Sequence, residues 1–215
     1  TIGWGGSIGD LVMSGNGASL FTCISVSGNA VFLSGDQALQ YQVSTNGAVN
    51  ISSVTGNPSG YTTASVKQAM ATLTQQARSH NLENEYNRIT KRAVDAAGQI
   101  NGAIGTTTYT FDNGTTVGQF PNTGLARQLA MVARLIKGRN ALGARRQVFF
   151  VSMGGFDLHD NLIANQGPLL RDLSNALAAF QTALGADAPY VTSFTASGFG
   201  RTLASNGDGT GHGWG

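Results

Sequence analysis

Cysteine, charge and long apolar runs are scarce in this chain of 215 residues, and each shortage excludes a class of protein. The single cysteine, Cys23, cannot form an internal disulfide or a zinc site built from several thiolates. Its apolar neighbours indicate a buried structural thiol. Charged residues make up 11% of the chain and the net charge is +2, which argues against a nucleic-acid-binding surface. No apolar run approaches the roughly 18 residues of a membrane span, so we expect none.

The signatures of several enzyme classes are also missing. There is no phosphate-binding P-loop, no Gly-x-Ser-x-Gly nucleophile turn, and no dinucleotide-binding glycine pattern before a helix. Ser152 and Ser197 are therefore interpreted as ordinary serines at the ends of strands. In place of charge, the chain has 30 glycines and many uncharged polar residues. That composition is more typical of exported proteins than of cytosolic ones.

Three regions with different patterns follow one another along the chain. Residues 1–60 alternate apolar and polar side chains around turn signals such as Asn46-Gly47, which predicts a small antiparallel β region of three or four strands. Residues 61–143 have helical periodicity. Residues 144–215 contain two short apolar runs separated by a helical stretch. We expect either a single domain or the central fragment of a larger one.

Local signals set the limits of the predicted helices. Thr62 or Thr63 is the expected cap of a long helix that breaks near His80, a residue interpreted as solvated rather than as a ligand. A second helix is predicted from Asn122 or Thr123 to Gly138 or Gly143, and a third from Pro168, because proline is favoured in the first turn. The apolar runs at 147–153 and 191–196 predict parallel strands buried on both faces, and therefore an α/β fold.

A polar loop follows each of the two predicted strands. At the carboxyl edge of a parallel sheet the two loops would meet, and ligands bind at that edge. Asp157 and His159 stand two residues apart in the first loop, so both can reach one metal ion of the zinc, manganese or iron type. The alternative is a turn in which Asp157 caps backbone N–H groups and His159 is a surface residue.

The second loop contributes Arg201, Asp208 and His212. The planar guanidinium of Arg201 can bind phosphate or sulfate, but it can equally pair with Asp157 or Asp160 and hold the two loops together. His212 lies between two glycines, which leaves room for a metal ion and equally suits a disordered end.

Several segments of the chain resemble the DUF1501 family, whose members are largely exported bacterial proteins grouped with the alkaline phosphatase and sulfatase superfamily. The resemblance implies an alkaline-phosphatase-like α/β/α core with metal ligands on loops at its carboxyl edge. It implies that Asp157, His159 and His212 are ligands of zinc or manganese and that Arg201 binds an oxyanion. The segments that carry it are GWGG at 3–6, GNAVFLSGD at 28–36, QYQVS at 40–44, FFVSMGGFDLHDN at 149–161, QGPLLRDLSNALAAF at 166–180 and FTASGFGRTLASNGDGTGHGWG at 194–215.

The chain departs from the family pattern at two positions where a carboxylate is usual, which Gly198 and Gly211 occupy here. Family members also extend beyond both ends of this chain, so the resemblance implies a central part without the nucleophile. We therefore expect an exported metal-dependent hydrolase of phosphate or sulfate esters with an incomplete site, in the periplasm or outside the cell. The alternative is a non-catalytic exported protein that binds a partner or self-assembles through edge strands.

Overall fold

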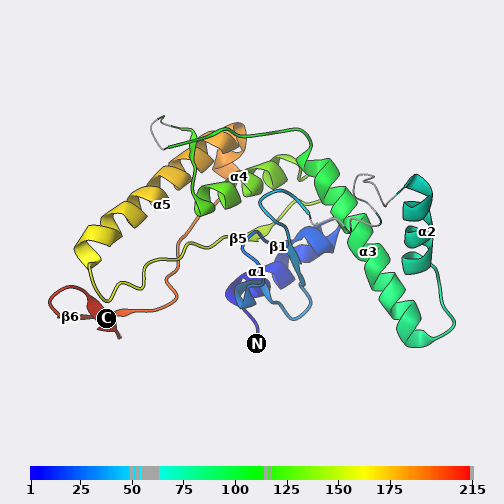
Figure 1. Cartoon of the computed structure of the whole chain (residues 1–215), viewed down its shortest axis with the longest axis horizontal. Helices are drawn as coiled ribbons and strands as arrows, with labels where there is room; N and C mark the ends of the chain where they lie inside the picture. The colour runs from blue at the N-terminus through cyan, green and yellow to red at the C-terminus, as the bar shows by residue number, and fades with distance from the viewer. Residues whose placement is uncertain (49–50, 52–53, 55–62, 114–115, 117, 214–215) are drawn as a thin grey trace.

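The computed structural model describes residues 1–215 except 49–50, 52–53, 55–62, 114–115, 117 and 214–215. Helices and strands are mixed, as expected for an α/β protein, and helix predominates (Figure 1). In chain order the elements are α1 (Trp4–Val12), β1 (Cys23–Ser25), β2 (Gln40–Gln42), α2 (Ala64–Gln75), α3 (Asn81–Ile104), β3 (Phe111–Asp112), β4 (Phe120–Pro121), α4 (Gly124–Lys137), β5 (Val148–Phe150), α5 (Leu162–Leu184), β6 (Arg201–Ser205) and β7 (Thr210–His212), with short 3-10 turns at Met13–Gly15, Ser19–Phe21, Val31–Leu33 and Gly185–Tyr190.

A three-stranded parallel sheet in the order β2-β1-β5 lies at the centre. Helix α1 packs on it through glycines, and a Cβ at Gly9 would collide with Cys23 Sγ. Cys23 is fully buried, which confirms the predicted structural thiol. Burial raises the pKa of this thiol to about 11, so the thiol stays protonated and unreactive at neutral pH.

Helix α4 forms the main apolar core together with α5. Nine of its residues are buried, among them Leu125, Leu129, Val132 and Ile136, which recur at helical spacing on one face. The hydroxyl of Thr123 accepts a hydrogen bond from the Ala126 N–H at 3.3 Å and so caps the helix. The helix ends before Gly138, so its prediction is confirmed at both ends.

The predicted start of the first helix in the middle region and the predicted break near His80 are also confirmed. Thr63 caps α2 by accepting a hydrogen bond from the Val66 N–H at 3.4 Å. The helical region breaks after α2, and α3 begins immediately after the exposed His80. Between α3 and α4 lies one short parallel pair, β3 with β4.

The predicted antiparallel β region near the N-terminus is wrong. Residues 4–12 form a helix, residues 31–33 form a 3-10 turn, and β1 pairs with β2 in parallel. Helix α1 was missed because glycines on its inner face interrupt the apolar pattern, although those glycines allow its close packing. The Asn46-Gly47 turn does form, with a bridge from Ser44 to Gly47, but the strand expected after it begins outside the described residues.

The predicted strand–helix–strand unit is also wrong in three respects. Residues 191–196 form no strand and are mostly exposed, and β5 is an edge strand that is only partly buried. Helix α5 begins at Leu162, six residues before Pro168, so the proline lies inside the helix. Proline removes the hydrogen bond to the carbonyl of Ala164, and because Ala164 is exposed, water can satisfy that carbonyl.

The molecule is elongated, with α2 and α3 projecting from one side of the centre and β6–β7 lying at the other (Figure 1). Its accessible surface is 13118 Å², whereas a compact monomer of this mass exposes about 9,400 Å². Within the described part of the chain, every helix falls short of the length or the apolar content that crossing a membrane requires.

Candidate metal centre

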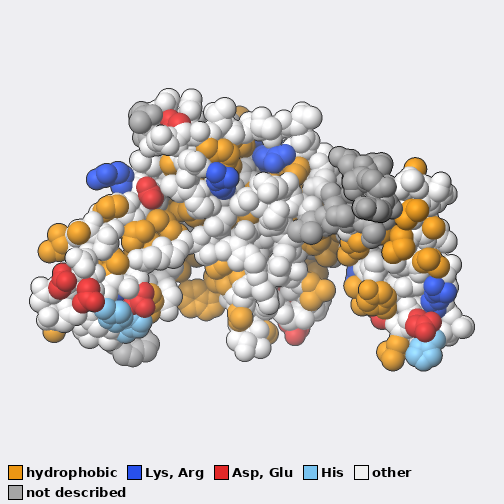
Figure 2. Space-filling model, in the orientation of Figure 1, with side chains coloured by type: hydrophobic (Ala, Val, Ile, Leu, Met, Phe, Trp, Pro, Cys, Tyr) orange, Lys and Arg blue, Asp and Glu red, His pale blue; other side chains and the backbone are white. Residues whose placement is uncertain are grey.

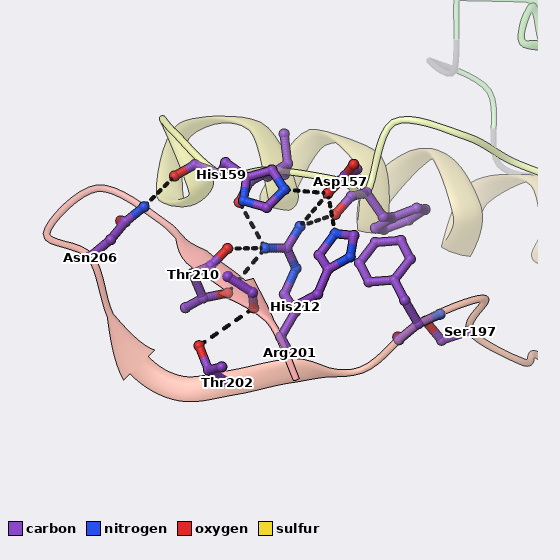
Figure 3. A network of polar contacts seen from close by, with 12 residues as sticks. Asp157, His159, Ser197, Arg201, Thr202, Asn206, Thr210 and His212 are labelled. Atoms are coloured by element: carbon purple, nitrogen blue, oxygen red, sulfur yellow. Dashed lines mark hydrogen bonds and ion pairs between the residues drawn. The ribbon is translucent and has the colours of Figure 1, made fainter. Parts of the chain in front are cut away.

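The candidate site forms where a hairpin of β6 and β7 docks against the segment between β5 and α5 (Figure 3). Arg201 and His212 are direct cross-strand partners in the hairpin, so their side chains share one face of it. Asp157 and His159 come from the opposing segment. Asn161 adopts a left-handed conformation (φ 53°), which asparagine tolerates better than most residues, and turns the chain into α5. The two polar loops predicted to meet therefore do meet.

One carboxylate oxygen lies at the centre of the cluster. Asp157 Oδ1 forms a hydrogen bond with His212 Nε2 at 2.7 Å and lies 2.9 Å from His159 Nε2. The ligand atoms of these three residues all lie within 4.8 Å of one another. All three side chains are about half exposed, so water and small ligands can reach them.

Stacked rings fix the orientation of the two imidazoles. The Phe199 ring stacks on His212 with centroids 4.4 Å apart, and His212 stacks on His159 at 5.0 Å. The Arg201 guanidinium lies over the outer part of this stack, 5.3 Å from the centre of the Phe199 ring. Sequence reasoning missed Phe199, because a single aromatic residue in a glycine-rich segment gives no signal of what it will contact.

Arg201 holds the two ligand-bearing segments together. Its Nη2 donates to the Phe156 carbonyl at 2.7 Å, and its Nη1 donates to the Leu158 carbonyl at 2.9 Å and to the Thr210 carbonyl at 2.6 Å. Nη2 also lies 3.6 Å from Asp157 Oδ1. Of the two carboxylates considered as its partner, Asp157 is the one it faces. Arg201 thus performs the loop-holding role that the sequence left open.

Hydrogen bonds to backbone carbonyls complete the docking of the hairpin. Asn206 Nδ2 donates to the His159 carbonyl at 2.9 Å, and the Leu162 N–H donates to the Asp208 carbonyl at 3.0 Å. Gly209 sits so close to His159 that a Cβ would collide with the His159 carbonyl. Asp208 therefore contributes through its backbone, and its exposed carboxylate is outside the ligand cluster.

The cluster stabilises the ionised form of Asp157. The hydrogen bond from His212 lowers the pKa of this carboxyl below its ordinary value, and the nearby charges of His212, His159 and Arg201 lower it further. Asp157 is therefore an anion at any pH near neutral, which is the state that a metal ligand requires.

The family can be assigned from a comparison that covers most of the chain. A family model described as "Protein of unknown function (DUF1501)" matches residues 13–215. The chain belongs to the DUF1501 family. No curated protein and no solved structure matches it. The match includes both segments of the ligand cluster, so the cluster lies within the DUF1501 region.

The donor set suits a small divalent ion. Two imidazole nitrogens and one carboxylate oxygen match zinc, and tetrahedral zinc with bonds of about 2.0–2.1 Å needs donors roughly 3.3 Å apart. The two His–Asp contacts are 2.7 and 2.9 Å, so these donors would separate by only a few tenths of an ångström around an ion. The half-exposed side chains leave a side open for water.

Gly198 and Gly211, the two glycines at which the resemblance led us to expect carboxylates, differ in their geometry. No atom lies within 4 Å of a Cβ placed on Gly198, so an acidic side chain has room there. Gly211 precedes His212 in β7, and successive side chains of a strand point to opposite faces. A side chain at 211 would meet Thr202 at 3.9 Å on the far face, so a carboxylate there would not join the cluster as it now stands.

Proposed function

We propose that Asp157, His159 and His212 bind a divalent metal ion, zinc or manganese, in a metal-dependent hydrolase of phosphate or sulfate esters. The supporting observation is that three ligand atoms from segments more than fifty residues apart converge on one point. We assign the domain to the alkaline-phosphatase-like α/β/α folds, a proposal supported by the mixed helix and parallel-strand content and by the resemblance of the loops.

Each residue has a defined part in this proposal. The carboxylate and two imidazoles would hold the ion, which when bound supplies Lewis acidity and an activated water or nucleophile. Arg201 keeps the ligands together, and its charge beside Asp157 adds to the positive potential that attracts an anionic ester. Ser197 is not assigned as nucleophile, because its hydroxyl donates to the Phe199 carbonyl at 2.7 Å.

We infer that the site of this chain is incomplete. Three protein ligands suffice for one zinc ion, but a two-metal hydrolase needs more donors and a nucleophile. Gly198 and Gly211 stand where two further carboxylates would be expected.

We also propose that the protein is bacterial and exported, to the periplasm or the cell exterior. The support is compositional: charged residues are only 11% of the chain, and glycine and uncharged polar residues take their place. A non-catalytic exported protein that binds or self-assembles is the second candidate. It is favoured by the large exposed surface and by apolar faces that no part of the described chain covers.

Metal analysis combined with turnover tests the first proposal. We expect the purified protein to bind one equivalent of zinc or manganese by elemental analysis and calorimetry. Asp157→Ala and His212→Ala should weaken binding by at least about tenfold, since lost support of a metal site commonly costs 10- to 100-fold. Asp160→Ala and His80→Ala are matched controls, because both residues lie outside the cluster.

Turnover of an aryl phosphate or aryl sulfate that depends on Asp157 would establish hydrolysis. Metal binding without turnover would retain the metal site and favour the non-catalytic candidate. A protein that binds neither metal, or whose affinity is the same in Asp157→Ala and Asp160→Ala, would contradict the proposed site.

A further inference from the structure

Helices α2 and α3 form a projection that we call the helical arm, residues 64–104. Along α3, apolar residues recur at alternating spacings of four and three, the pattern of a helix–helix seam. The seam is buried only where α3 enters the core, at Ala96 and Ile100. Farther out it is open, with Leu82 77%, Tyr86 67% and Ile89 47% exposed. The full seam comprises Leu82, Tyr86, Ile89, Ala93, Ala96 and Ile100.

Helix α2 does not cover this seam. It contacts α3 on another face, where the buried Asn87 donates from Nδ2 to the Gln76 carbonyl at 2.8 Å. None of the residues of α2 is buried, and Val66 and Leu73 are about half exposed. Figure 2 shows apolar side chains gathered over both helices of the arm. A helix of 12 residues is marginal in water by itself, so α2 requires further burial to be stable.

The molecule as a whole has enough exposed surface to accommodate a standard interface. The molecule exposes roughly 3,700 Å² more than a compact monomer of its mass, and a standard interface buries about 800 Å² per partner. Contiguous apolar patches of more than a few hundred Å² mark interaction sites on soluble proteins. A shallow hollow opens beside the seam and offers a place for an inserted side chain, lined by Arg78, Leu82, Glu83, Tyr86 and Asn87.

We propose that the occupant is a second copy of this chain, whose α3 packs antiparallel against the first. In a symmetric dimer both copies use the same surface. If residue i of one copy contacts residue j of the other, then residue j of the first copy also contacts residue i of the second. If α3 crosses its copy midway between Tyr86 and Ile89, each of these residues faces the other on the second copy. Leu82 then faces Ala93 in the same way. The seam is therefore complementary to itself in the antiparallel arrangement.

The charges beside the seam favour the same arrangement. Glu85 and Arg92 are seven residues apart, so they lie on the same flank of the seam, one on each side of the crossing point. Antiparallel pairing places Glu85 of each copy next to Arg92 of the other, giving two equivalent attractive contacts. Within one copy Glu85 pairs with Arg88, whereas the described ion pairs do not include Arg92. The candidate metal centre is at the far end of the molecule and stays outside this interface (Figure 1).

Sedimentation equilibrium or light scattering at micromolar concentration tests the dimer. We expect the wild-type chain to be dimeric, and Tyr86→Glu or Ile89→Glu to raise the dimer dissociation constant by at least about tenfold, as for residues central to an interface. Both side chains are exposed in the single chain, so circular dichroism should show that the variants still fold. Leu203→Glu is the matched control, because Leu203 is 96% exposed and lies far from the arm.

A charge exchange tests the antiparallel register. Glu85→Arg alone and Arg92→Glu alone should each weaken the dimer, and the double variant should restore it toward the wild-type value. A monomeric wild-type chain, a dimer that Tyr86→Glu leaves intact, or a double variant weaker than both singles would overturn the proposal. Zinc binding measured on the same variants should not change, so this result is independent of the proposed metal site.

Discussion

Helix α4 and the β6–β7 hairpin are ordered by opposite means. Nine residues of α4 are buried and hold it by apolar packing, whereas in the described hairpin, residues 201–212, Gly209 is the one buried residue. The hairpin is held instead by directional contacts from a few side chains, chiefly Arg201 and Asn206. Burial is spread over many atoms, so α4 should be stable over a wide range of conditions. Docking of the hairpin depends on few atoms, so the hairpin should detach by local opening while the rest of the chain stays folded.

Replacing a leucine by alanine in each region should give the largest difference in the free energy of unfolding. Leu135 in α4 is fully buried, so Leu135→Ala should lower the free energy of unfolding by about 2–5 kcal/mol through lost burial and the cavity left behind. Leu203 in β6 is 96% exposed, so Leu203→Ala should change the free energy of unfolding by no more than about 0.5 kcal/mol. Urea unfolding of both variants makes the measurement. Equal losses would mean that the hairpin belongs to the cooperative core.

Removing the Arg201 clamp should separate local from global stability. Arg201→Met leaves the carbonyls of Phe156, Leu158 and Thr210 without their donor, at a cost that corresponds to about tenfold faster opening of the hairpin. Hydrogen exchange should speed up accordingly at the Leu162 amide, which donates to the Asp208 carbonyl across the docked surfaces.

Two variants sharpen this test of Arg201. Arg201→Lys keeps the charge but not the planar fork, so we expect it to restore little of the protection. Full rescue by lysine would instead assign Arg201 a purely electrostatic role. Arg171→Met, an exposed change on α5, should leave exchange in the hairpin unaltered.

The smallest effect we predict is a dependence of hairpin docking on acid. The pKa of Asp157 is lowered in the folded chain, so its contribution is fully present above the unfolded value of about 3.9 and is lost as the pH falls through the lowered value. Amide exchange of the hairpin should therefore lose protection below about pH 4, while α4 stays protected. Asp157→Asn should remove this transition and Asp160→Asn should not. A transition that persists in Asp157→Asn would assign it to another group.

The sequence predicted those elements whose signals are local. The cap at Thr123, the stripe of α4, the cap at Thr63 and the break at His80 all lie within a few residues of the structure they determine. The parallel pairing of β1 with β2 and β5 depends on residues far apart in the chain, and no local pattern specifies it. The run at 191–196 has the composition of a buried strand, but within the described part of the chain no strand pairs with it.

The candidate site shows the same division. The sequence predicted that the two loops would meet, but at the edge of a parallel sheet whose second strand, 191–196, does not form. They meet instead because the antiparallel β6–β7 hairpin docks on the first loop and brings His212 to Asp157 and His159. That these residues bind a metal remains a prediction. The stacking of Phe199 and the carbonyl contacts of Arg201 were not predictable, because each depends on exact distances across the docked surfaces.

Helix α1 has its small residues inside and its large ones outside. Trp4, Ile8 and Leu11 follow helical spacing and are mostly exposed, while Gly9 faces Cys23 of the sheet and the other glycines of the helix face residues 32–35. Replacing a helical glycine by alanine ordinarily favours the helix by about 1 kcal/mol. At Gly9 the same replacement would force the helix away from Cys23, so a change that improves α1 as an isolated peptide would weaken the folded protein. Helix-forming tendency and tertiary packing select opposite residues at this position.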